Sequence, residues 1–176
     1  MVVSADGHSR QPRVNPQAAE LKAFADRVRD YVELRSKAES GLPKLGTTED
    51  AARIEAHRRA LAAAIQAARA SARQGDVFGE AAKLIRRIVA EDARARPARD
   101  RHAAMREVPS KSPPGVNAPY PEPAAVATVP PLLLTRLPQL PDGLEYRFMG
   151  RDLILHDAKA HLIVDIVPEA VPLIRS

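Results

Sequence analysis

Residues 144–171 read LEYRFMGRDLILHDAKAHLIVDIVPEAV, and this stretch decides the fold class. Apolar and polar residues alternate through three short runs, which is the period of a half-buried strand. Gly150 lies in the first turn, a polar turn separates the second and third runs, and Pro168 ends the third. The pattern therefore predicts a three-stranded antiparallel meander with strands at 144–149, 153–157 and 162–167.

The alternation also predicts which side of the meander is buried. A sheet this small needs another layer on its apolar face to be stable, so we expect it to pack on the first half of the chain. A slip of one residue would turn the aliphatic set toward solvent, and the register is constrained for that reason. The residues expected to face the helices are Leu144, Tyr146, Phe148, Leu153, Leu155, Leu162, Val164 and Ile166.

The first half of the chain has the apolar period of amphipathic helices. Asn15 followed by Pro16 predicts the start of the first helix, and Gly41 with Pro43 predicts its end. A second helix is expected to begin at Thr47 or Thr48 and to close at Gly75. Its shared apolar face consists of Ile54, Leu61, Ile65 and Ala68.

A third helix is expected from Asp76 or Gly79, and its apolar stripe ends at Ala90. The predicted fold is therefore α+β, with an N-terminal three-helix unit made of an antiparallel hairpin plus a third helix. The expected organisation is a disordered N-terminus, a helical unit, a Pro-rich linker and a β-meander that packs on the helices. The corresponding ranges are 1–15, 16–107, 108–141 and 142–176.

The composition removes several classes of chemistry. The chain has no cysteine, which excludes thiol nucleophiles, disulfides and thiolate metal sites. It also lacks a nucleophile elbow and a phosphate-binding loop, and its carboxylates are scattered singly. We assign no catalytic or cofactor-binding residue and expect no cofactor. A non-catalytic structural or interaction role is the favoured function. The sequence does not identify a partner, and another protein is the candidate.

The net charge of +5 is concentrated in the helical half. An Arg-rich segment there offers an alternative function, nonspecific nucleic-acid binding in the cytosol. No aromatic residues interleave with it, and opposite charges are mixed along the helices, so nucleic acid is not the favoured partner. The residues of this alternative are Arg94, Arg96, Arg99, Arg101 and Arg106.

Imidazoles and carboxylates come together only around the turn between the second and third runs. His156 and His161 bracket this turn, and Asp157 lies beside them. Two imidazoles and a carboxylate could hold a divalent ion, which makes periplasmic metal handling a second alternative. The spacing matches no established zinc pattern, so these three residues are candidates and no metal ligand is assigned.

The segment EYRFMGRDLILHDAKAHLIVDIV (145–167) resembles the C-terminal meander of small exported bacterial proteins, including the periplasmic family linked to nickel and cobalt homeostasis. It departs from that pattern at residues 159–161, Lys-Ala-His, where a Thr-Gly turn would be expected. The segments RVRDYVELRSKAESGLPKL, RQGDVF and VPPLLLTRLPQLPDGLEYRFMGRDLIL are similar to uncharacterised exported proteins of Gram-negative bacteria. These resemblances imply a fold and a compartment, and they bring no site residues.

The resemblance implies that an export signal precedes the mature chain. Residues 1–15 hold no apolar core long enough for such a signal, although Val3, Ser4 and Ala5 have the spacing of a cleavage site. One hypothesis is that the true start lies upstream of Met1 and that the protein is periplasmic or secreted. The other is a cytoplasmic protein with an ordinary N-terminus. No segment approaches a transmembrane span.

Overall fold

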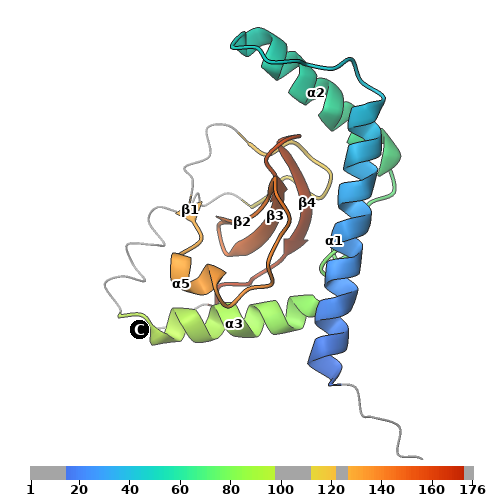
Figure 1. Ribbon diagram of the computed structural model, residues 1–176. Coiled ribbons are helices and arrows are strands. Elements are labelled where there is room, and N and C mark those ends of the chain that lie inside the picture. The colour runs from blue at the N-terminus through green and yellow to red at the C-terminus, as the bar shows by residue number, and fades with distance from the viewer. Residues whose placement is uncertain (1–14, 98–111, 122–126, 173–176) are drawn as a thin grey trace, which may run out of the picture.

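The computed structural model describes residues 15–97, 112–121 and 127–172. Helices form the first half of the chain, and an antiparallel sheet forms the last part, which confirms the α+β prediction. Figure 1 shows α1 and α3 bordering the sheet. The long helices are α1 (Pro16–Ser40), α2 (Ala51–Ala68) and α3 (Ala81–Ala95), and the meander strands are β2 (Leu144–Met149), β3 (Asp152–Asp157) and β4 (Leu162–Val167).

The helix boundaries follow the capping side chains. The side chain of Asn15 accepts a hydrogen bond from the backbone N–H of Gln17, so α1 begins where the sequence predicts. The second helix begins later than predicted because the side chain of Asp50 caps it. It also ends at Ala68, before the predicted stop at Gly75, and Ile54 is 43% exposed although we expected it on the apolar face.

The segment expected to be a Pro-rich linker adds two short elements that the sequence did not predict. β1 (Ala127–Thr128) pairs with β2 and makes the sheet four-stranded, in the order β1-β2-β3-β4. The four-residue helix α5 (Pro131–Leu134) follows it. Val129 and Leu133 are buried in the same apolar cluster as the helices, so this part of the segment belongs to the core.

Both faces of the sheet are buried. The helix-facing cluster includes a stack in which Phe78 lies between Phe24 and Tyr146, with ring centroids 5.5 and 6.5 Å apart. A second, smaller cluster covers the opposite face, and its residues are Tyr120, Met149, Ile154, Ile163 and Ile166. The simple expectation of one buried and one solvated face is therefore wrong.

A β-bulge explains why Ile166 lies on the face opposite to the predicted one. The pairing of β3 with β4 passes from Leu155↔Asp165 to His156↔Ile163, so Val164 has no partner of its own. An extra residue in one strand puts two successive side chains out of the regular alternation. Asp165 consequently joins Val164 on the helix side, and Ile166 turns to the second cluster.

Candidate functional site

Two buried aspartates join the sheet to the helices, and the first is Asp157 at the end of β3. One oxygen, Oδ2, accepts hydrogen bonds from the Tyr31 hydroxyl at 2.7 Å and from the Arg35 guanidinium at 3.3 Å. The other, Oδ1, accepts from the backbone N–H groups of Lys159 and Ala160. Both oxygens of this fully buried carboxylate are thus occupied, and its role is to anchor α1 to the sheet.

The second buried aspartate is Asp165, which the bulge turns toward the helices. Its carboxylate accepts hydrogen bonds from the backbone N–H groups of Gly75, Val77 and Phe78, at 2.7, 2.8 and 2.8 Å. It also accepts from the N–H of Ile166. These loop N–H groups have no acceptor in a helix, and the Asp165 carboxylate provides one. Asp165 therefore holds the loop between α2 and α3 in place.

A cluster of three rings lies on the other face of the sheet. Tyr120 comes from the segment at 112–121, and its N–H donates to the carbonyl of His161 at 2.9 Å. The ring centroids are 4.6 Å apart for Tyr120 and His156, 5.5 Å for Tyr120 and His161, and 5.3 Å for the two histidines. Within the described residues, neither ring nitrogen of His156 nor the Tyr120 hydroxyl has a hydrogen-bond partner, although all three atoms are buried. Each such atom costs about 1–3 kcal/mol when nothing satisfies it.

The sequence-predicted metal candidates are only partly brought together. His156 and His161 are neighbours, but Asp157 does not join them because its carboxylate bonds to α1 and the following turn. Successive residues of a strand point to opposite faces, and this separates Asp157 from His156. Among the described residues, no group of three or more His, Cys, Asp or Glu side chains could hold a metal ion. The third ring of the cluster belongs to Tyr120, which we did not predict from the sequence.

The environment of His156 favours the neutral imidazole. Burial lowers the pKa of His156 to about 4, and the neighbouring His161 and Arg147 act in the same direction. Glu145 and Asp157 oppose them by attracting a positive charge, with a smaller effect. The ring is 4% exposed, so a charged imidazole there would lack the solvation that water gives it.

We expect the free energy of unfolding to fall by about 3 kcal/mol as the pH drops from about 7 to about 4 because of His156 alone. The pKa of this imidazole is lower in the folded chain than the ordinary value of 6.5. The unfolded chain therefore binds the proton first, and stability that is complete above pH 6.5 is lost as the pH falls to 4. Urea denaturation at a series of pH values, with a chelator present, measures this. His156→Leu should remove that part of the slope, and an unchanged slope would contradict the assignment.

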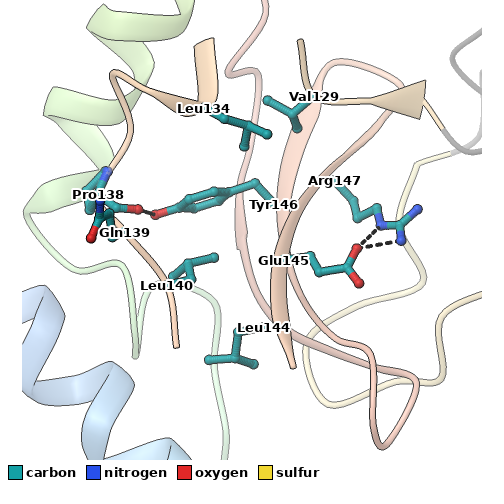
Figure 2. A pocket seen from close by; sticks show the side chains of 9 residues that line it. All are labelled: Val129, Leu134, Pro138, Gln139, Leu140, Leu144, Glu145, Tyr146 and Arg147. Atoms are coloured by element: carbon teal, nitrogen blue, oxygen red, sulfur yellow. Dashed lines mark hydrogen bonds and ion pairs between the residues drawn. The ribbon is translucent and has the colours of Figure 1, made fainter. Parts of the chain in front are cut away.

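A groove of about 400 Å³ lies beside β2. Figure 2 shows Leu144 and Tyr146 on one side of the strand and Glu145 and Arg147 on the other. Because four consecutive strand residues line the groove, it follows the edge of β2 instead of lying over one face of the sheet. Its lining consists of Val129, Leu134, Pro138, Gln139, Leu140, Leu144, Glu145, Tyr146 and Arg147.

The groove opens where β1 stops. Pairing between β1 and β2 ends at Thr128↔Arg147, and the chain then turns into α5 through Pro130, which has no N–H to donate. Among the described strands, none pairs with the outer edge of residues 144–146. This part of β2 is an open sheet edge, which is a template for pairing with another chain.

The backbone of Tyr146 points toward the open edge. The N–H of Ala158 donates to the carbonyl of Gly143 at 2.8 Å, which continues the ladder between β2 and β3 beyond the strand end. In an antiparallel strand, the backbone N–H and C=O groups of successive residues point alternately to the two neighbouring strands. The backbone groups of Leu144 and Tyr146 therefore point away from β3. The N–H of Leu144 already donates to the carbonyl of Pro141. Tyr146 is therefore the residue that an added strand would meet.

The Arg-rich segment is described only in part. Arg94 is exposed in the last turn of α3, and Arg96 forms an ion pair with Asp92 at 2.7 Å. Arg99, Arg101 and Arg106 lie outside the described residues. The described part thus presents one exposed guanidinium and one that is already paired.

The chain was compared with protein-family models, with curated proteins and with solved structures, and none of them matches. The resemblance to exported proteins therefore stays a prediction. No helix within the described ranges is long and apolar enough to cross a membrane. The groove and the ring cluster are the two features of the fold from which a function can be proposed.

Proposed function

We propose that this protein is a non-catalytic interaction protein that binds an extended segment of another protein along the open edge of β2. The observation that carries the proposal is a groove that follows four consecutive residues of an edge strand at the point where β1 stops. In this mode of recognition, main-chain hydrogen bonds provide affinity and pockets for alternate side chains provide specificity. Export to the periplasm belongs to the same proposal and is supported by the sequence resemblance.

The two sides of the groove indicate what the partner segment looks like. One side is apolar and offers Leu134, Leu140 and the ring of Tyr146, whose hydroxyl donates to the carbonyl of Pro138 at 3.0 Å and so stays in place. The other side carries the ion pair between Arg147 and Glu145, at 2.5 Å. A segment that alternates apolar and polar residues fits both sides at once.

Two neighbouring leucines of α5 provide a matched test. Leu134 lines the groove and is 43% exposed, whereas Leu132 is 77% exposed and is not part of the lining. Peptides selected from a random phage-displayed library on the wild-type protein should bind Leu134→Glu at least tenfold more weakly, because the new carboxylate must be desolvated against an apolar segment. Leu132→Glu should bind them as the wild type does.

The site of binding is checked on the same peptides by amide chemical shifts. The largest changes are expected at residues 144–147 and at Val129. Equal binding by the two glutamate variants would contradict the proposal. So would shift changes confined to the helices.

A further inference from the structure

We propose that His156 and His161, supported by Tyr120, form a binding site for one divalent transition-metal ion of the zinc class. The cluster lies between the turn that joins β3 to β4 and the segment at 112–121. This inference uses other contacts than the groove, so either proposal can fail without the other.

The first support is the unsatisfied polar chemistry of the cluster. His156 is 4% exposed and Tyr120 is 5% exposed, and both ring nitrogens of His156 and the Tyr120 hydroxyl are buried without a hydrogen-bond partner among the described residues. The surroundings are apolar, with Ile154 and Ile163 in the same cluster. Buried polar atoms are normally paired, and an ion bound between the imidazoles supplies a partner for one nitrogen of His156.

The second support is the spacing of the two imidazoles. Their ring centroids are 5.3 Å apart and the ring planes are nearly perpendicular, at 84°. Two imidazoles on one tetrahedral ion, with metal–nitrogen distances of about 2.0–2.1 Å, have ring centroids about 5 Å apart. The separation of the two rings is therefore the one that a single bound ion requires.

The backbone of His161 provides a way to test the role of its ring. It has a φ of +55°, a left-handed conformation that glycine adopts at less cost than any residue with a Cβ. The N–H of Tyr120 donates to the His161 carbonyl through the backbone, so this bond does not require a histidine. The ring of His161 can therefore be removed by a change to glycine without adding backbone strain.

The donor atoms indicate the class of ion. Imidazole nitrogens favour zinc, copper and nickel, whereas magnesium and calcium require oxygen ligands, and Asp157 is already bonded to α1. An imidazole binds a metal ion through a nitrogen of its neutral form. Arg147 and Glu145 are charged groups that act electrostatically on His156, and they form an ion pair with each other.

The test uses the full chain, stripped with a chelator and titrated with zinc chloride by calorimetry. We expect one zinc ion per chain and a higher melting temperature with zinc. His161→Gly should weaken zinc binding at least 100-fold while the melting temperature of the metal-free protein stays equal or rises, because glycine relaxes the left-handed turn. His57→Ala, which removes a histidine of α2 outside the cluster, should bind zinc as the wild type does.

Two further measurements make the outcome unambiguous. Tyr120→Phe should weaken zinc binding about tenfold, which is the effect of losing a supporting polar group. Cobalt chloride should give the visible absorption of a tetrahedral site in the wild type and none in His161→Gly. The proposal is overturned if the wild type binds neither ion, or if His161→Gly, folded and stable, binds zinc as well as the wild type does.

Discussion

Replacing Asp165 with Ala should lower the free energy of unfolding by about 3–5 kcal/mol. The backbone N–H groups of Gly75, Val77 and Phe78 donate to this one carboxylate, and those of Val77 and Phe78 do so in the buried interior. Alanine leaves these donors without an acceptor and frees the loop between α2 and α3. Urea denaturation followed by circular dichroism at pH 7 measures the loss.

Asp76 in the same loop provides the control for this substitution. Among the described residues its carboxylate accepts one hydrogen bond, from the N–H of Arg73, and this bond is exposed to solvent. Asp76→Ala should therefore lower the free energy of unfolding by only about 0.5–1.5 kcal/mol. Equal losses for Asp165→Ala and Asp76→Ala would show that the buried carboxylate does not hold the loop.

Replacing Asp157 with Ala should have an effect of similar size, about 3–5 kcal/mol, for a different reason. The guanidinium of Arg35 is 4% exposed and forms its ion pair with Asp157, and it also donates to the carbonyl of Asp142 at 3.1 Å. Without the carboxylate, that carbonyl is the one acceptor left to the buried guanidinium within the described residues. Thermal and urea unfolding of Asp157→Ala measure the loss.

Two companion variants separate the charge from the hydrogen bonds. Tyr31→Phe removes only the hydroxyl that donates to Asp157, so it should cost about 1–2 kcal/mol. The double variant Arg35→Met with Asp157→Leu removes both charges and should recover most of the stability that Asp157→Ala loses. A double variant as unstable as Asp157→Ala would contradict the stranded-charge explanation.

The strands and the first helix could be predicted from the sequence because their signals are local. Alternation fixed 144–149 as a strand, and Asn15 with Pro16 marked a helix start that the structure confirms. The bulge at Val164 could not be predicted, since an aspartate inside an apolar strand fits a solvated face equally well. Arg35 likewise has the pattern of any arginine on an amphipathic helix. Its burial depends on a carboxylate far away in the sequence.

The candidate sites were only partly within reach of sequence reasoning. The proximity of His156 and His161 follows from a turn that is visible in the sequence, but Tyr120 comes from a Pro-rich segment with no period that would place it. The groove depends on where β1 stops, and the one local signal for that stop is Pro130 followed by Pro131. Periodicity indicates where a helix or strand forms, but it does not predict which distant segments pair with each other.

The distance along the chain between bonded partners has a consequence for synthesis on the ribosome. Tyr31 and Asp157 are 126 residues apart, and Phe78 and Asp165 are 87 apart. The helices leave the ribosome first, and Arg35 and the loop at 75–78 then lack their carboxylate partners until the last strands have been made. Contacts this remote slow folding and prolong the exposure of apolar surface. Nascent chains that end before β3 should therefore be the forms most in need of a chaperone.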